Sequence, residues 1–200
     1  MLLPDGPSDG PLFLFAHGAG GAMDTKFMND VARLMGDCGV RVVRFEFPYM
    51  AARREGGRRG APDRQPLLLD SWRQMIEEHG GGAKVAIGGK SMGGRMASLI
   101  ADEMNVRALV CFGYPFHPPG KPQQLRTAHL ESLRTPTLIV QGTRDPFGTP
   151  EEVAGYPLSS SIRIEWLEDG DHSFKPRKAS GHSEGGHVAR AAELAAAFVR

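Results

Sequence analysis

The chain has 200 residues, of which 40% are hydrophobic and 24% are charged, a composition typical of one soluble globular domain with a full core. Its formal net charge of +1 gives no overall field that would favour nucleic acid or a membrane surface. The first residues include Asp5 and Asp9, where a secretory signal would be basic, and the apolar run at residues 12–16 is too short to span a bilayer. We therefore expect a single cytoplasmic domain over residues 1–200, with neither nucleic acid nor a membrane as partner.

Short apolar runs rich in Val, Ile, Leu and Phe alternate with stretches of helical periodicity. The predicted strands are residues 12–16, 40–47, 84–88, 106–112, 136–141 and 162–167. The predicted helices are residues 24–35, 66–79, 92–104, 151–156 and 186–200, the first with Asp24 as N-cap and Gly36 just past its end. This alternation predicts parallel βαβ units, and therefore an α/β fold whose sheet has helices on both faces.

The cysteines and histidines lack the spacings of a disulfide framework or a metal site. Cys38 and Cys111 form no C-x-x-C motif, and without a secretory signal they are expected to be reduced and partly buried. Five histidines show no i, i+4 pairing and no cysteine or carboxylate partner at ligand spacing; they are His79, His117, His129, His182 and His187. We expect no disulfide and no metal.

The stretch IGGKSMGG, residues 87–94, allows two interpretations that imply different chemistry. The tripeptide GKS is how a phosphate-binding loop ends, but the full motif requires a glycine at position 84, which holds a lysine. The predicted strand also continues up to residue 88 and leaves no flexible loop to wrap a phosphate. The pentapeptide GKSMG instead matches Gly-x-Ser-x-Gly, in which a strand, a sharp turn and a helix present a nucleophilic serine. This context favours Ser91 as a nucleophile.

With this motif in its strand, turn and helix, the chain resembles the α/β-hydrolase family, in particular its small, capless members similar to dienelactone hydrolases. The resemblance extends from residue 12 to the final helix. The family's order of nucleophile, acid and histidine is present as well, because TLIVQGTRDPFG places Asp145 after the penultimate strand and IEWLEDGDHSF places His172 after the last one. Asp169 and Asp171 are rival acids, but they lie on the same short loop as His172, too near to brace its ring from across the site.

The resemblance also implies an oxyanion hole. The first predicted strand ends in HGAGG, residues 17–21, where the family's oxyanion loop lies, so the amides of Met92 and Ala19 are the implied donors to the oxyanion. His17 is expected to pin this loop rather than to act as a second base. The candidate substrate contacts are His17, Gly18, Arg53, Arg54 and Phe116.

The implied enzyme is a serine hydrolase that cleaves a small carboxylic ester, thioester or lactone. His172, oriented by Asp145, would take the proton of Ser91 as the serine attacks a carbonyl, and water would cleave the resulting acyl-enzyme. A small acyl compound is therefore the expected partner, and no cofactor is required. Dienelactone hydrolases proper use a cysteine nucleophile, so the serine departs from their pattern.

Two features shorten the chain relative to larger relatives. Only eleven residues precede residue 12, so we expect a minimal sheet of about six mostly parallel strands. The stretch between the predicted strands 106–112 and 136–141, where many relatives insert a helical cap, is short. The site should therefore be shallow and open, without a sizeable cap.

Two further possibilities concern function. A non-catalytic interaction protein can retain the same fold, because fold does not determine function, although such proteins usually lose members of the triad. The basic stretch MAARREGGRRGAPDR, residues 50–64, leaves the sheet at the edge that carries the triad. It is either a solvated loop or a set of guanidinium groups that attract a substrate carboxylate or phosphate. Its arginines are Arg53, Arg54, Arg58, Arg59 and Arg64.

Overall fold

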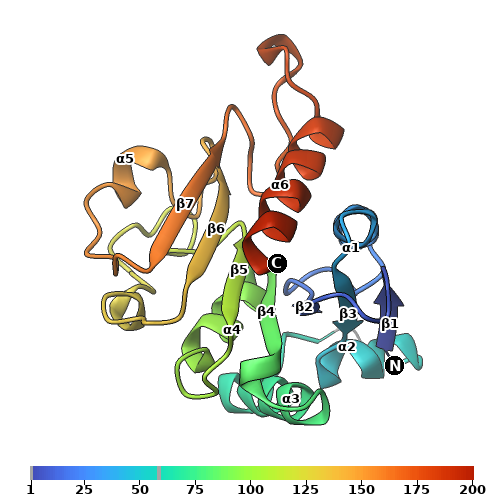
Figure 1. The fold of residues 1–200 in the computed structure, drawn as a ribbon. Coiled ribbons are helices and arrows are strands. Elements are labelled where there is room, and N and C mark those ends of the chain that lie inside the picture. Colours follow the sequence, from blue (N-terminus) through green and yellow to red (C-terminus); the bar gives the residue numbers. More distant parts are fainter. Residues whose placement is uncertain (1, 58–59) are drawn as a thin grey trace.

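A seven-stranded sheet forms the centre of the protein in the computed structural model, which describes residues 2–57 and 60–200 (Figure 1). Its strands are β1 (Leu2–Asp5), β2 (Leu12–Ala16), β3 (Arg41–Phe45), β4 (Val85–Lys90), β5 (Ala108–Phe112), β6 (Thr137–Gly142) and β7 (Ile162–Leu167). They lie in the order β1-β3-β2-β4-β5-β6-β7, and neighbouring strands are parallel except for β1 and β3. The mostly parallel α/β fold predicted from the sequence is confirmed.

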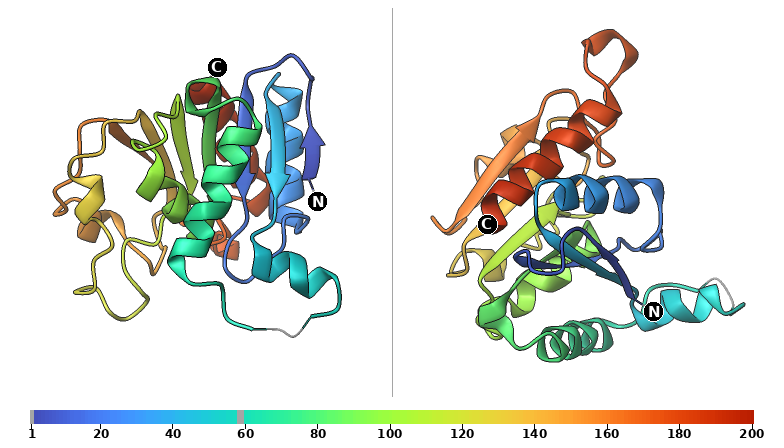
Figure 2. Two further views of the ribbon diagram at one scale, coloured as in Figure 1. Left: turned by 90° about the horizontal axis from the view of Figure 1, so that it is seen from below. Right: turned by 45° about the vertical axis from the view of Figure 1, so that its right-hand side comes forward.

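Helices cover both faces of this sheet. They are α1 (Lys26–Asp37), α2 (Pro48–Arg54), α3 (Gln65–Glu78), α4 (Met92–Ile100), α5 (Pro150–Val153) and α6 (Glu184–Val199), with 3-10 turns η1 (Gly82–Lys84), η2 (Ala128–Leu130) and η3 (Lys178–Ser180). Helices α1 and α6 pack together on one face, and α3 and α4 pack on the other (Figure 2). None of the helices in the described residues is long and apolar enough to cross a bilayer.

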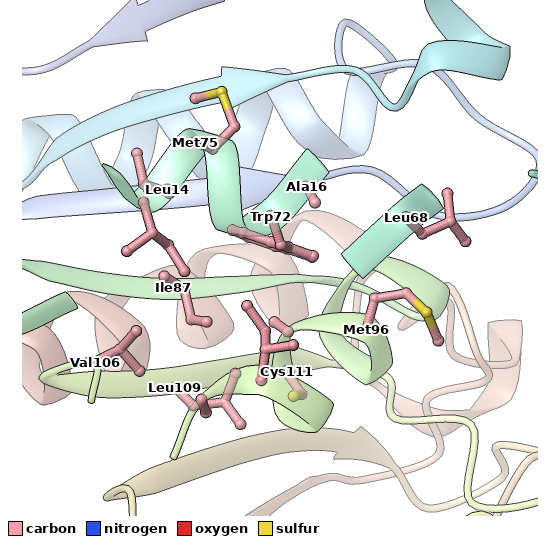
Figure 3. Packing of buried hydrophobic residues seen from close by; sticks show 14 of the residues in the cluster. Leu14, Ala16, Leu68, Trp72, Met75, Ile87, Met96, Val106, Leu109 and Cys111 are labelled. Carbon is pink, nitrogen blue, oxygen red and sulfur yellow. The ribbon is translucent and has the colours of Figure 1, made fainter. Parts of the chain in front are cut away.

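The alternation of side chains along the strands sorts the core into two layers. In β2, Phe13 and Phe15 belong to the layer under α1 and α6, whereas Leu14 and Ala16 belong to the layer under α3 and α4. All four side chains are completely buried. Figure 3 shows the second layer, in which Trp72 of α3 lies over the strands. Because both faces are covered, the edge at the carboxyl ends of the parallel strands is where polar side chains can gather.

The sequence predicts about six strands, and the structure adds a seventh, β1, at the edge of the sheet. This strand pairs antiparallel with β3, and Pro4 lies opposite Val43. Proline and aspartate are depleted in strands, so the segment LLPD carries little strand signal. Proline is tolerated here because one side of an edge strand has no strand partner. The formation of β1 therefore depends on tertiary contacts, among them an ion pair of 2.8 Å between Asp5 and Arg44.

The first helix begins and ends two residues later than predicted, at Lys26 and Asp37. Thr25 is its N-cap, and Asp24 instead forms an ion pair of 2.8 Å with Arg54. Gly36 lies inside the last turn rather than beyond it. A Cβ on Gly36 would lie 2.9 Å from the amide nitrogen of Gly6, so this glycine permits close packing rather than ending the helix.

The basic stretch after β3 begins as a helix rather than as a loop. Helix α2 covers Pro48–Arg54, with proline at its first position, where the missing N–H is not needed. The predicted stretch 50–64 therefore starts on a regular element that fixes the direction of Arg53 and Arg54. Arg58 and Arg59 lie outside the described residues.

Candidate active site

Ser91 lies between β4 and α4, in a strained turn at the carboxyl edge of the sheet. Its φ is 50° and its ψ is −113°, a backbone conformation that residues other than glycine rarely adopt. The Ser91 amide donates a hydrogen bond of 3.0 Å to the carbonyl of Phe112, and the Ser91 carbonyl accepts one of 3.0 Å from the amide of Arg95 in α4. The strand, turn and helix predicted around a nucleophilic serine are therefore present.

Two glycines allow this turn to close. A Cβ on Gly89 would lie 2.6 Å from the carbonyl carbon of Gly93, and a Cβ on Gly93 would lie 2.6 Å from the carbonyl oxygen of His17. Both separations are too short for a real contact, so a side chain at either position would push apart β4, α4 and the loop after β2. The glycines thereby set how closely the serine approaches that loop.

A hydrogen-bonded chain joins Ser91 to side chains from two later loops. His172 Nε2 lies 2.9 Å from Ser91 Oγ, and His172 Nδ1 lies 2.8 Å from Asp145 Oδ2. Asp145 follows β6 and His172 follows β7, and parallel strands deliver all three residues to one edge. When Nδ1–H donates to the carboxylate, Nε2 is free to accept the hydroxyl proton of Ser91.

Asp145 is completely buried, and both oxygens of its carboxylate accept further hydrogen bonds. Oδ1 accepts from the amide of Phe147 at 2.9 Å, and Oδ2 accepts from the side-chain amide of Gln141 at 3.0 Å. Gln141 is itself oriented, since its Oε1 accepts a hydrogen bond of 2.7 Å from the amide of Tyr114. A glutamine near the end of an apolar strand is not part of a recognisable motif. The sequence therefore did not indicate that Gln141 is a partner of Asp145.

The rival acids Asp169 and Asp171 have other partners. Asp169 accepts hydrogen bonds from the backbone amide and the guanidinium of Arg177, both at 2.6 Å. Asp171 accepts from two backbone amides of the turn that follows it, at 2.7 and 3.0 Å. Both carboxylates therefore shape the loop that carries His172, while Asp145 reaches its ring from across the site.

The surroundings of His172 favour a neutral imidazole. Burial lowers the pKa of His172, the hydrogen bond from its ring to Asp145 opposes this shift, and the ammonium group of Lys90 adds to it. The side chain keeps 22% of its surface exposed, so part of the ring remains accessible. A histidine that is neutral at neutral pH is able to act as a general base.

The loop after β2 presents its backbone to the nucleophile. His17 is completely buried, its Nε2 accepts a hydrogen bond of 3.1 Å from the amide of Phe47, and its Nδ1 then donates one of 2.7 Å to the carbonyl of Gly18. Because the C=O and N–H of a trans peptide point in opposite directions, the amide of Ala19 is turned away from the His17 ring. Met92 is the first residue of α4, where amides have no acceptor within the helix. His17 thus pins the loop and directs the amide of Ala19 away from its own ring.

A cavity of about 560 Å³ opens in front of Ser91 and His172. Its walls come from the loop after β2, the start of α1 and the loop after β6, and they include Gly18, Ala19 and the side chains of Phe27, Met28 and Phe147. The rings of Phe147 and His172 lie 4.2 Å apart between centroids. Apolar walls next to a few polar groups suit a small organic ligand.

The arginines predicted to contact substrate border a separate hollow. Arg54 forms ion pairs with Asp24 at 2.8 Å and Glu46 at 2.7 Å. The guanidinium of Arg53 lies over the ring of Tyr49, 5.0 Å from its centroid. These two side chains therefore lie apart from the cavity in front of Ser91, because α2 directs them toward acidic and aromatic partners on the protein.

Two other predicted substrate contacts, Phe116 and His17, are core residues. Phe116 is completely buried, and its ring carbon Cδ2 lies 2.6 Å from where a Cβ of Gly148 would be, so it offers no surface to a ligand. His17 is also completely buried, and it supports the loop after β2 from behind. Of this group, Gly18 alone borders the cavity in the described part of the chain.

Among residues 2–57 and 60–200, no group of three or more His, Cys, Asp or Glu side chains is placed to hold a metal ion. Cys38 and Cys111 are free thiols. Cys111 is buried beside Gly94, with its Sγ 3.1 Å from a Cβ built there, and burial raises the pKa of its thiol. Its contribution is therefore to packing.

Known proteins share this architecture. Residues 9–200 match the family model described as the alpha/beta hydrolase domain. A dienelactone hydrolase from Anabaena variabilis is 22% identical, with a TM-score of 0.69 over 98% of this chain and 90% of that chain. An a/b serine hydrolase without lid from Xanthomonas campestris is 19% identical, with a TM-score of 0.68 over 96% and 88% of the two chains. A monoacylglycerol lipase from Paleococcus ferrophilus is 15% identical, with a TM-score of 0.73 over 99% and 98%. The likenesses show a common fold, and the family match over most of the chain shows that this protein belongs to the alpha/beta hydrolase family.

Proposed function

We propose that this protein is a serine hydrolase that cleaves a small carboxylic ester, thioester or lactone. The supporting observation is the hydrogen-bonded chain from the buried Asp145 through His172 to Ser91, with distances of 2.8 and 2.9 Å. A general base must lie within such reach of the proton it removes. An interaction protein with the same fold would have no need to keep all three groups aligned.

The reaction would begin when Ser91 Oγ attacks the substrate carbonyl carbon and His172 Nε2 takes the hydroxyl proton. The carbonyl electron pair moves onto oxygen, and the amides of Met92 and Ala19 would stabilise this oxyanion. His172 then gives its proton to the departing alcohol or thiol, which leaves an acyl-enzyme. Water attacks the acyl-enzyme with the same base, releasing the acid and restoring the serine.

The cavity supports a substrate of modest size. Its volume of about 560 Å³ and its apolar walls suit a short hydrocarbon group on either side of the scissile bond. The connection between β5 and β6 carries the 3-10 turn η2, and none of its residues borders the cavity, which supports a site without a sizeable cap. The likeness to a lipase and to a dienelactone hydrolase supports an ester or lactone as the bond that is cleaved.

A fluorophosphonate probe and a panel of p-nitrophenyl esters of graded chain length test this proposal. The wild-type protein should be labelled covalently and should hydrolyse at least one ester, whereas Ser91→Ala should do neither. The melting temperature of Ser91→Ala should remain close to that of the wild type, because the hydroxyl contributes little packing. A wild-type protein that is not labelled and hydrolyses no ester would favour a non-catalytic role. Full turnover by Ser91→Ala would rule out Ser91 as the nucleophile.

A further inference from the structure

Lys90 connects the strand that carries the nucleophile to the loop that carries the base. It is the last residue of β4, directly before Ser91, and it borders the cavity. Its ammonium group donates a hydrogen bond to the backbone carbonyl of His172. The contact joins two segments that are far apart in the sequence, and it acts on the backbone of the base rather than on its ring.

Two aromatic rings and a glycine surround the ammonium group of Lys90. Lys90 Nζ lies 5.6 Å from the ring centroid of Phe27 and 5.3 Å from that of Phe174. A cation near the face of an aromatic ring is stabilised, more so when it is partly removed from water. Gly113 leaves room for it, since a Cβ there would lie 2.6 Å from Nζ and 3.2 Å from the His172 carbonyl oxygen. The position of the ammonium group is therefore fixed by its neighbours.

The loop that carries His172 contains backbone conformations that need external support. Asp169 and Phe174 have φ values of 56° and 67°, in the left-handed region that is unfavourable for residues with a side chain. Such conformations persist only where surrounding contacts hold them. Phe174 is completely buried and packs edge-on against Phe27, with centroids 5.5 Å apart. Loss of the Lys90 contact would leave the His172 carbonyl without this hydrogen bond and allow the loop to relax.

We propose that Lys90 is a positioning residue for His172. Its ammonium group holds the loop that carries His172 against β4, so that the imidazole stays within hydrogen-bond reach of Ser91. This inference rests on the serine hydrolase function proposed above. Nucleophile and base are then fixed through two adjacent residues, the last residue of β4 and the one that follows it. The lysine of the sequence GKS, which resembles the end of a phosphate-binding loop, thereby has a role within the hydrolase site.

The charge of Lys90 adds an electrostatic effect that a purely structural contact would lack. Burial is the main cause of the lowered pKa of His172, and the Lys90 ammonium adds to it, whereas Asp145 and Asp171 oppose it. Burial also lowers the pKa of Lys90, to about 8, against the same two carboxylates. Lys90 is therefore still charged at the pH values where His172 takes up a proton. The other charged groups on the cavity are Lys26 of α1 and Glu184 of α6.

Lys90→Met removes the donor and the charge while keeping much of the length of the side chain. Lys90→Arg keeps both properties, and Lys84→Met is the matched control, because Lys84 is an exposed lysine directly before the other end of β4. In the full-length protein, kcat and KM for a neutral p-nitrophenyl ester, the rate of fluorophosphonate labelling and the melting temperature are measured across pH 5 to 9. Lys84→Met should match the wild type in every measurement.

We expect Lys90→Met to lower kcat and the labelling rate about 10- to 100-fold with little change in KM, because a misplacement of about 1 Å between reacting groups can cost that much. Loss of the positive charge should also raise the pKa of His172 and move the acidic limb of kcat/KM to higher pH. Lys90→Arg should recover part of kcat and keep the limb near its wild-type position.

Several results would overturn the role of Lys90. One is a Lys90→Met variant with wild-type kcat and an unmoved acidic limb. Another is a rise in KM confined to an anionic ester, which would make Lys90 a substrate contact. A third is a lower kcat with an unmoved limb and a lower melting temperature, which would make the lysine merely structural. If the wild-type protein is not labelled at all, the serine hydrolase function itself fails, so the two proposals are distinguished.

Discussion

Gly93→Ala tests whether close approach of two backbones explains the glycines around Ser91. Gly93 lies inside α4, outside the positive-φ region, so helix propensity alone would favour alanine by about 1 kcal/mol. A Cβ there would lie 2.6 Å from the carbonyl oxygen of His17 and 2.7 Å from that of Ala16. These are backbone atoms at the end of a buried strand, which cannot rotate away as a side chain can. Overpacking costs about 1–3 kcal/mol, so the steric effect should exceed the gain in propensity.

Thermal unfolding and fluorophosphonate labelling measure this change. At about 2–4 °C per kcal/mol for a chain of this size, Gly93→Ala should melt up to several degrees below the wild type. Its labelling rate should fall, because a displaced α4 moves the amide of Met92. Gly185→Ala is the matched control: Gly185 is an exposed residue in the first turn of α6, its Cβ would have no atom within 4 Å, and alanine there should raise the melting temperature slightly. A Gly93→Ala variant that melts at or above the wild-type temperature with unchanged labelling would refute the steric explanation.

Asp145→Asn should lower kcat by up to about 10⁴-fold, because an amide in place of the carboxylate can favour the wrong imidazole tautomer. Asp171→Asn should have only a small effect on kcat. Steady-state kinetics that reverse this order would reassign the acid. The value of kcat/KM should rise with pH along a limb whose midpoint lies below about 6.5, because burial lowers the pKa of His172 and the base must be unprotonated. A pH titration that is flat, or has its midpoint above that value, would contradict a buried histidine base. Arg54→Gln should change KM equally for anionic and neutral esters, because Asp24 and Glu46 already pair with its charge. A larger rise for the anionic ester at low ionic strength would restore Arg54 as a substrate contact.

The meeting of Ser91, Asp145 and His172 was predictable because chain order and strand ends define their positions. Ser91 lies in a glycine-flanked turn, and Asp145 and His172 each follow an apolar run that reads as a strand. In a parallel sheet the carboxyl ends of such strands meet at one edge, so three residues that are distant in the sequence were expected to lie together. The distances in the structure agree with that expectation.

The partners of charged and amide side chains were not predictable in this way. Arg54 pairs with Asp24 and Glu46, which come from other segments, so a count of arginines in one stretch overstated the positive charge available to a substrate. Gln141 is oriented through the amide of Tyr114, which follows the neighbouring strand. Both arrangements arise from tertiary approach between elements, and local propensity contains no information about them.

The loop after β2 shows how residues buried behind a site can orient the backbone amides that face it. His17 fixes the carbonyl of Gly18, and the hydroxyl of Tyr49 in α2 donates a hydrogen bond of 3.0 Å to the carbonyl of Ala19. These two carbonyls belong to the peptides on either side of Ala19, so neither peptide can rotate without breaking a hydrogen bond. An amide held in this way needs no reorganisation when negative charge develops, which is the condition for strong electrostatic stabilisation. The segment after β3, whose basic residues first suggested substrate binding, thus supports the proposed oxyanion hole from behind.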